Sequence, residues 1–198
     1  MTPPAGTRAG MTRTFVALLI PDSWIDYVRN VERQLSGRSA GLSWVKPENA
    51  HFTVRFLGDM DPDQLPRVLE SVRRNGEGLA APMARLGRLG AFPRPERPRV
   101  LWIGLAQGGP EAEAIAAAVN DGLERDGFGF PDKPFRAHLT VARAREGARG
   151  VESLMRASLA DPPPAEPLTR LVVMKSQLHP SGAMYNVLEE IRLHSPGS

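Results

Sequence analysis

The chain has 198 residues, 41% of them hydrophobic and 24% charged, which is the composition of a globular protein with one domain or two small lobes sharing a core. It contains no cysteine, so disulfides, thiol nucleophiles and thiolate metal sites are excluded, and no apolar run approaches membrane-spanning length. Three lysines and 22 arginines make up its 25 basic residues, a bias that fits a phosphate-bearing partner or a general preference for arginine in the source proteome. We expect a cytoplasmic protein without a membrane partner.

The start of the chain is predicted to hold a strand, a helix and a second strand. Residues 1–12 lack periodicity and are expected to be a disordered tail, followed by a single domain over residues 13–198. Strands are expected at 14–20 and 42–45, and the helix between them is indicated by apolar residues at helical spacing as far as Leu35. Residues 37–41 match the G-x-S-x-G nucleophile pattern, but that pattern needs a strand before it and a helix after it, so we interpret them as a loop.

The segment 50–57 has the period-two pattern of a strand with one packed and one open face. Its apolar residues are Phe52, Val54 and Phe56, and they alternate with His51, Thr53 and Arg55. We therefore expect an imidazole, a hydroxyl and a guanidinium on the open face.

The rest of the chain adds further strands and helices. Helices are expected at 61–74, 110–125 and, as a short one, 149–159, and strands at 83–92, 99–105, 168–178 and 184–193. In a second histidine strand, Arg136, His138 and Thr140 share the open face, while Leu139 and Val141 face the core. This order of elements favours an α+β fold with antiparallel sheets.

The two histidine strands carry tetrads of the same pattern, a histidine, an apolar residue, a threonine and a valine. His51-Phe52-Thr53-Val54 returns as His138-Leu139-Thr140-Val141, and with four histidines and seven threonines the chance of such a pair is on the order of 1%. The tetrads lie 138 − 51 = 87 residues apart, close to half the folded length. We therefore expect two pseudo-symmetric lobes of antiparallel sheet with flanking helices around a central groove, each lobe donating one tetrad.

The histidines, threonines and arginines on the open faces of the two strands suit a phosphate. Imidazoles exchange protons near neutral pH, hydroxyls donate hydrogen bonds to phosphate oxygens, and arginine binds them with a planar fork. Arg55 and Arg136 are read either as solvated charges or as phosphate contacts. His179 and His194 are read as structural or solvent-exposed. Four aromatic residues are read as core, with one of them able to stack on a base: Trp44, Phe92, Trp102 and Tyr185.

The paired tetrads resemble those of the two-histidine phosphoesterase superfamily. Flanking residues resemble its bacterial RNA 2',3'-cyclic phosphodiesterase branch, also described as 2'-5' RNA ligases. Those residues are Arg13-Thr14-Phe15-Val16-Ala17, Trp44, Pro47-Glu48-Asn49, Phe56-Leu57-Gly58, Phe92-Pro93, Pro98-Arg99-Val100-Leu101-Trp102, Pro134-Phe135-Arg136, Ala142-Arg143, Ser176, Gly182 and Tyr185. The chain departs from the family at Ala137, where we expect proline.

We expect a monomer without a cofactor. The resemblance implies that it opens the 2',3'-cyclic phosphate end of RNA to a 2'-phosphate without a metal, and members of the family can also join RNA ends by 2'-5' ligation. It gives His51 the role of proton donor and His138 that of proton acceptor, with Thr53, Thr140 and Arg143 holding the phosphate. Simple alternation places Arg143 on the packed face, so a bulge or the strand end must turn it into the groove. Two alternatives remain open. One is a phosphodiesterase of a small cyclic nucleotide phosphate or 2',5'-oligonucleotide, and the other is a non-catalytic RNA-end binding protein.

Overall fold

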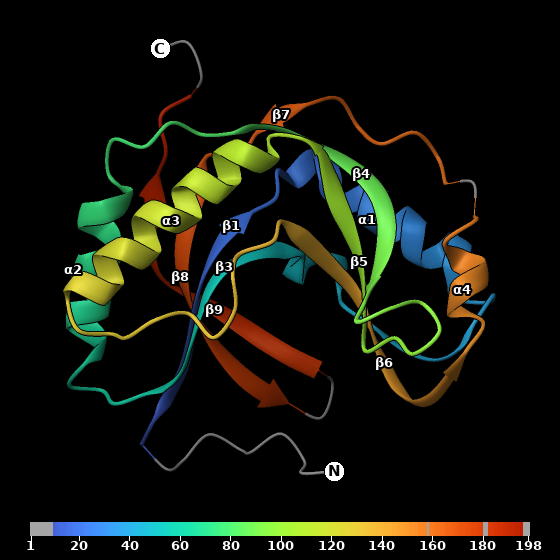
Figure 1. Cartoon of the computed structure of the whole chain (residues 1–198), viewed down its shortest axis with the longest axis horizontal. Helices are drawn as coiled ribbons and strands as arrows, with labels where there is room; N and C mark the ends of the chain where they lie inside the picture. Colours follow the sequence, from blue (N-terminus) through green and yellow to red (C-terminus); the bar gives the residue numbers. More distant parts are fainter. Residues whose placement is uncertain (1–9, 158, 180–181, 196–198) are drawn as a thin grey trace.

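The computed structural model describes residues 10–157, 159–179 and 182–195 (Figure 1). The strands are β1 (Thr12–Leu19), β2 (Ala40–Trp44), β3 (His51–Met60), β4 (Met83–Phe92), β5 (Val100–Gln107), β6 (His138–Arg149), β7 (Glu166–Pro167), β8 (Arg170–His179) and β9 (Gly182–Arg192). The helices are α1 (Asp22–Leu35), α2 (Leu65–Gly76), α3 (Gly109–Arg125), α4 (Val151–Leu154) and the short 3-10 helix η1 (Pro47–Asn49).

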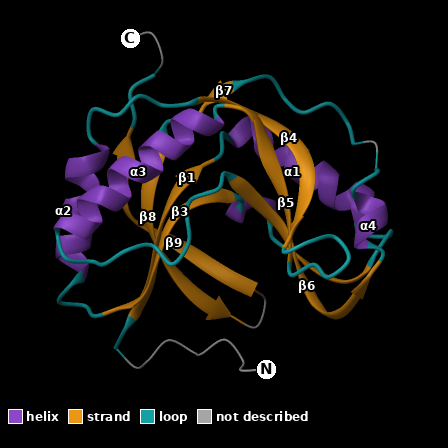
Figure 2. Cartoon of the chain, in the orientation of Figure 1, coloured by secondary structure: helices purple, strands orange, loops and turns teal. Residues whose placement is uncertain are grey.

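The named strands form one sheet in the order β7-β4-β5-β6-β3-β1-β8-β9, with β2 paired to β6. All of these strand pairings are antiparallel. The sheet narrows in the middle, where β3 meets β6 through the pair Phe52 and Leu139, and it curls on either side of this seam (Figure 2). It therefore consists of a His51 lobe, made of β3, β1, β8 and β9, and a His138 lobe, made of β6, β5, β4, β7 and β2. The expected α+β fold with two antiparallel lobes is confirmed.

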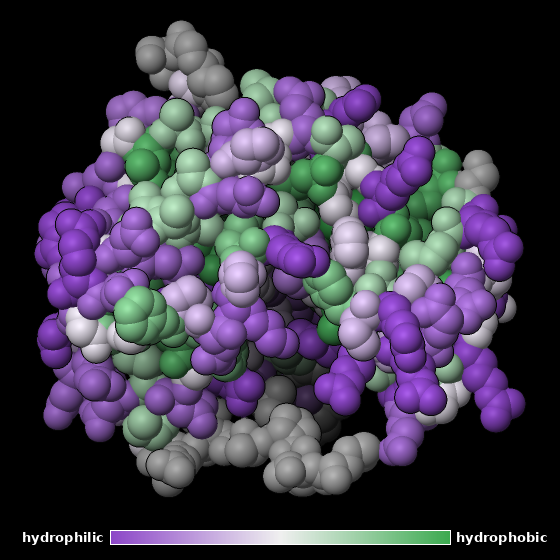
Figure 3. All heavy atoms as spheres, viewed as in Figure 1, coloured by the Kyte–Doolittle hydropathy of each residue, from purple (hydrophilic) through white to green (hydrophobic). Residues whose placement is uncertain are grey.

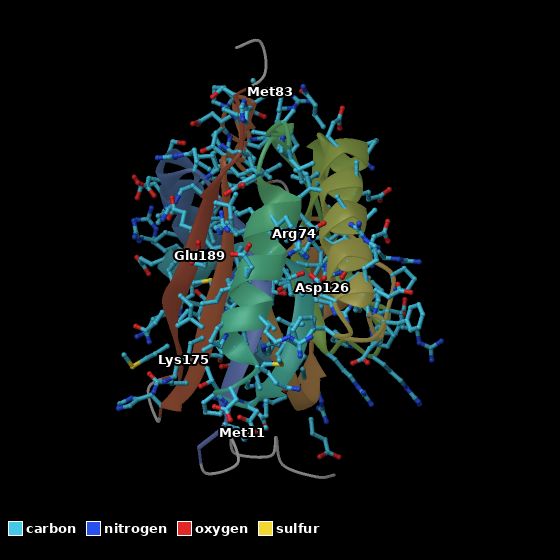
Figure 4. The ribbon with its side chains drawn as sticks, turned by 90° about the vertical axis from the view of Figure 1, so that its left-hand side faces the viewer. Met11, Arg74, Met83, Asp126, Lys175 and Glu189 are labelled. Carbon is cyan, nitrogen blue, oxygen red and sulfur yellow. The ribbon has the colours of Figure 1, made fainter. Side chains whose placement is uncertain are left out.

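Each lobe is covered by a helix that follows a strand of the other lobe. Helix α1 follows β1 of the His51 lobe, yet its Ser23 hydroxyl donates to Glu166 of β7 in the His138 lobe. Helix α3 follows β5 of the His138 lobe, yet it packs beside α2 on the His51 lobe (Figure 1). An ion pair of 2.6 Å between Arg74 of α2 and Asp126 at the end of α3 joins these helices (Figure 4). The exchange ties the lobes together.

The central pair Phe52 and Leu139 belongs to the main core, and neither side chain is exposed to solvent. Burying a large apolar side chain stabilises a fold by about 1.5–3 kcal/mol. Because neighbouring side chains on a strand point to opposite faces, burying these two residues toward the helices turns the flanking histidines and threonines toward the other face. The core thereby positions both tetrads.

Several element boundaries differ from the sequence-based expectation. Strand β1 begins at Thr12, inside the segment expected to be a tail, whose residues 1–9 lie outside the described residues. Helix α2 begins at Leu65 because residues 61–64 form a turn, in which the Asp63 amide donates to the Asp61 carboxylate. Strand β6 begins at His138, not at Arg136, and runs to residue 149 beside β2. The two-residue strand β7 was not expected.

Candidate active site

Strand β3 contains a β-bulge directly after its histidine and threonine. Across β1, Ala17 pairs with Thr53 and Val16 pairs with Arg55, so Val54 has no partner. A bulge inserts one extra residue and shifts the alternation of the side chains that come after it. Arg55 and Phe56 therefore lie on the opposite faces from those that simple alternation predicts.

The bulge sends Arg55 to the helix side of the sheet. Arg55 is only 5% exposed, and its guanidinium donates to the Asn120 side chain at 3.2 Å and to the carbonyl oxygens of Phe128 and Gly129 at 3.1 and 3.0 Å. Phe56 takes the groove side, where it is 46% exposed. The expectations of an open-face Arg55 and a core Phe56 are both wrong, and Arg55 instead anchors the loop that follows α3.

Strand β6 contains a bulge at the same place in its tetrad. Strand β5 pairs with Thr140 and then with Ala142, which leaves Val141 without a partner. The shift turns Arg143 away from the core, and this exposed residue borders the same pocket as His51. The bulge that the placement of Arg143 required is therefore present.

The two tetrads lie side by side in opposite directions. With their central residues paired, the antiparallel register sets His51 opposite Thr140 and Thr53 opposite His138. His51 and His138 are close enough to interact electrostatically. The seam between the lobes therefore brings together both imidazoles and both hydroxyls.

Each histidine is oriented by the backbone two residues before it. Nδ1 of His51 lies 2.7 Å from the Asn49 carbonyl oxygen, and Nδ1 of His138 lies 2.7 Å from that of Arg136. Because a carbonyl oxygen only accepts, Nδ1 carries a proton in both rings, and Nε2 is left for chemistry. Nε2 of His51 lies 3.1 Å from the Thr53 hydroxyl, which donates to it when the ring is neutral.

Aromatic rings surround His51. Phe15 stacks on its imidazole at a centroid distance of 4.9 Å, and Tyr185 meets it edge-on at 5.4 Å. Burial lowers the pKa of His51 to about 4; the bond to the Asn49 carbonyl opposes the shift, and the charges of Arg143 and His138 add to it. His51 is therefore neutral at pH 7 in the free protein.

His51 borders a pocket of about 370 Å³, and the space-filling view shows a recess between the lobes with hydrophilic rims (Figure 3). The pocket is lined by Arg13, Phe15, His51, Thr53, Phe56, Arg143, Ser176, Ala183 and Tyr185. Among these residues there are two guanidinium groups and no carboxylate, so the pocket favours an anion. Sequence reasoning gave no role to Arg13, although it lies two residues before Phe15 on β1 and hence on the same face.

His138 borders a second hollow of about 320 Å³, and Phe92 meets its ring edge-on at 5.1 Å. The structure thus gathers His51, Thr53 and Arg143 around one pocket and places His138 beside it. Thr140 is half-buried at the seam. His179 ends β8 and His194 follows β9, and neither is a lining residue of these two hollows.

Within the described residues, no group of three or more histidine, aspartate or glutamate side chains gathers in the manner of a metal site. No described helix is long and apolar enough to cross a membrane.

Comparison with known proteins gives concordant matches. A family model described as LigT like Phosphoesterase matches residues 18–102. An RNA 2',3'-cyclic phosphodiesterase of Archaeoglobus fulgidus is 35% identical over 89% of this chain and 97% of its own length. A Thermus thermophilus relative with the same name is 32% identical over 91% of this chain and 90% of its own length.

Solved structures of known proteins match the chain in fold. A crystal structure from Thermus thermophilus matches with a TM-score of 0.73 and 26% identity over 93% of this chain and 99% of that one. E. coli LigT complexed with 3'-AMP shares the fold, with a TM-score of 0.71 and 19% identity over 92% of this chain and 98% of that one. With its paired tetrads at the seam of two lobes, the chain belongs to the LigT-like family of two-histidine phosphoesterases.

Proposed function

We propose that the protein hydrolyses the 2',3'-cyclic phosphate end of RNA to a 2'-phosphate without a metal ion. The observation that carries the proposal is the juxtaposition of two imidazoles, each with Nδ1 tied to a carbonyl oxygen, beside a pocket with two guanidinium groups. The names of the relatives support the same reaction.

In this reaction the two histidines have complementary roles. His138 takes a proton from water, whose oxygen attacks phosphorus in line with the 3'-oxygen. The bond from phosphorus to the 3'-oxygen breaks, and His51 protonates that oxygen while the 2'-phosphate remains. Each proton transfer contributes about 10²–10⁴ to the rate.

The remaining residues stabilise the charge that develops on the non-bridging oxygens. Arg143 borders the pocket, and the hydroxyl of Thr53 lies next to Nε2 of His51. Thr140 lies opposite His51 across the seam. Donors directed at developing negative charge lower the barrier most in sites that exclude water.

His51 must be protonated to act as the acid, although its pKa in the free protein is about 4. A bound phosphate diester carries a negative charge beside the ring and favours the imidazolium form. Substrate binding therefore prepares the acid. An RNA 5'-hydroxyl in place of water would turn the same arrangement into a 2'-5' ligase.

Incubation with an RNA that ends in a 2',3'-cyclic phosphate, in the presence of EDTA, tests the proposal. We expect a 2'-phosphate product from RNA and from 2',3'-cyclic mononucleotides. A 3'-phosphate product would contradict the assigned leaving group. Tight binding without turnover would favour an RNA-end binding protein, and turnover restored only by a divalent ion would exclude the metal-free mechanism.

A further inference from the structure

Trp102 of β5 lies flat over two glycines on the groove side of the His138 lobe. Its neighbours in the strand, Leu101 and Ile103, are fully buried on the opposite face, whereas Trp102 is half-buried. Gly90 pairs with it across β4, and a Cβ atom at Gly90 would lie 2.3 Å from the indole. A Cβ atom at Gly104 would lie 3.1 Å from the ring. The indole needs these glycines in order to lie against the sheet.

This position is not optimal for stability. The indole Nε1 is buried and has no hydrogen-bond partner among the described residues. A buried donor without an acceptor is destabilising, and tryptophan normally satisfies its N–H when it is buried. Trp102 nevertheless borders two adjoining hollows. Both hollows are lined by Trp102, Gly104 and Leu105. Its arrangement keeps an aromatic surface available at the groove.

The hollow that Trp102 shares with His138 differs in charge from the pocket beside His51. Its charged lining residues are Arg136 and Glu113, which have opposite signs. The His51 pocket has two arginines and no carboxylate among its lining residues. A phosphate therefore favours the His51 pocket, and a neutral, flat group suits the surface of Trp102.

The distance from Trp102 to the catalytic seam is short. Phe92 lies between them, with ring centroids 5.0 Å from Trp102 and 5.1 Å from His138. One nucleoside can span this distance when its hydroxyl or phosphate lies at His138 and its base lies on the indole. Aromatic side chains commonly hold the unstacked bases of single-stranded RNA in this way.

We propose that Trp102 stacks a nucleobase, and that this base belongs to the nucleoside on the His138 side of the reacting phosphate. The inference rests on the proposed function, in which the attacking group lies on that side. The nucleoside stacked on Trp102 occupies the place of the attacking water, whereas the nucleoside that carries the cyclic phosphate lies on the His51 side. Trp102 therefore selects ligands with a second nucleoside beyond the phosphate.

Two ligands distinguish the nucleoside on the His51 side of the phosphate from the one on the His138 side. Calorimetry measures their dissociation constants without turnover. Adenosine 2'-phosphate has one nucleoside, and a 2',5'-linked adenosine dinucleotide has a second one beyond the phosphate. We expect Trp102→Leu to weaken binding of the dinucleotide about tenfold, the usual effect of losing one stacked base. Binding of adenosine 2'-phosphate should change less than about twofold.

A second variant displaces the indole without removing it. Gly90→Ala puts a methyl group into the space that the ring occupies, so it should cause the same selective loss. Trp44→Leu is the matched control, because Trp44 is a half-buried tryptophan on β2 that does not border the hollow. Thermal unfolding of each variant verifies the fold, and Trp102→Phe, which keeps a smaller ring, should show an intermediate loss.

The outcomes are distinct. Equal weakening of both ligands would overturn the proposal, because the base on Trp102 would then belong to the nucleoside that carries the phosphate. Unchanged binding of both would show that no base stacks there. Failure of the wild type to hydrolyse an RNA that ends in a 2',3'-cyclic phosphate would refute the proposed function, and the two dissociation constants would still report on Trp102.

Discussion

The strands β3 and β6 have the same backbone path but different side chains after their tetrads. Both continue through a bulged valine, after which the next two positions hold Arg55 and Phe56 in β3 but Ala142 and Arg143 in β6. The fourth position after each histidine faces the helices, and the fifth faces the groove. The fold therefore repeats the histidine and threonine pair and the bulge, and the positions after the bulge distinguish the lobes.

The surroundings of the two histidines differ accordingly. His51 is enclosed by Phe15 and Tyr185 and lies in a cationic pocket. His138 meets Phe92 at its ring edge and borders a hollow that contains a carboxylate. Two tetrads of the same pattern are thus placed in different electrostatic environments, which is a requirement for two imidazoles that act as acid and base.

The largest expected effect comes from removing either histidine. His51→Ala and His138→Ala should each lower kcat on a 2',3'-cyclic nucleotide by at least ~10², because each imidazole transfers a proton in the transition state. The double variant should lose much less than the product of the two effects, since both act on one transition state. Steady-state kinetics with His179→Ala as control tests this. Equal damage from His179→Ala would show that the wrong histidines were chosen.

A substrate with a good leaving group distinguishes the two roles. A nitrophenolate departs without an acid, so His51→Ala should recover most of its ~10² loss on a nitrophenyl phosphodiester of a nucleotide, while His138→Ala stays impaired. Hydrolysis rates measured from the release of nitrophenolate test this. Recovery of His138→Ala instead would reverse the roles. Recovery of neither would mean that the histidines mainly hold the phosphate.

Arg143 and Phe56, at the fifth position after each histidine, should differ strongly in their contribution to kcat/KM. Arg143→Ala should lower kcat/KM by about 10², because it removes a charged donor from the phosphate pocket. Phe56→Ala, at the matching position of the other lobe, should cost much less. Arg143→Lys should recover part of the loss, as lysine keeps the charge but not the planar fork. Kinetics at low and high salt would test these three variants, and equal losses for Arg143→Ala and Phe56→Ala would disprove the asymmetry.

Arg55 lies at the fourth position after His51, which faces the helices, and it should contribute to the stability of the fold. Arg55→Leu should lower the free energy of unfolding by about 1–3 kcal/mol, because it removes a buried charged donor and its hydrogen bonds to Asn120, Phe128 and Gly129. The control is Arg73→Leu, which removes two exposed ion pairs that solvent screens, so its loss should be much smaller. Urea unfolding monitored by circular dichroism gives both values. Similar losses would mean that Arg55 is not a structural anchor.

The smallest expected effect concerns proton uptake by His51. Its pKa is about 4 in the free protein, and a bound anion raises it, so anion binding takes up protons between the two pKa values and strengthens as pH falls from 7. Sulfate is a suitable probe, because its own charge stays constant over this range. Its affinity should rise at most about tenfold per pH unit for one proton. Calorimetry of the wild type and His51→Gln measures this, and an unchanged slope in the variant would assign the proton elsewhere.

The sequence determined much of this protein. The repeated tetrad alone identified the catalytic candidates and the two-lobed plan, because it combines local alternation with a spacing of half the chain. Phe52 and Leu139 then face the core as alternation requires, and the histidines face the groove. These features depend on the period of a strand, which is a local property.

The tertiary structure decided where the residues after each tetrad lie. A bulge exists only in the pairing of two strands, so the sequence of β3 or β6 alone did not reveal that Val54 and Val141 are skipped. The bulges place Arg55 under the sheet and direct Phe56 and Arg143 into the groove. The flat position of Trp102 likewise depends on Gly90 in a neighbouring strand. The specific pocket therefore arises from register, which is set by contacts between distant segments.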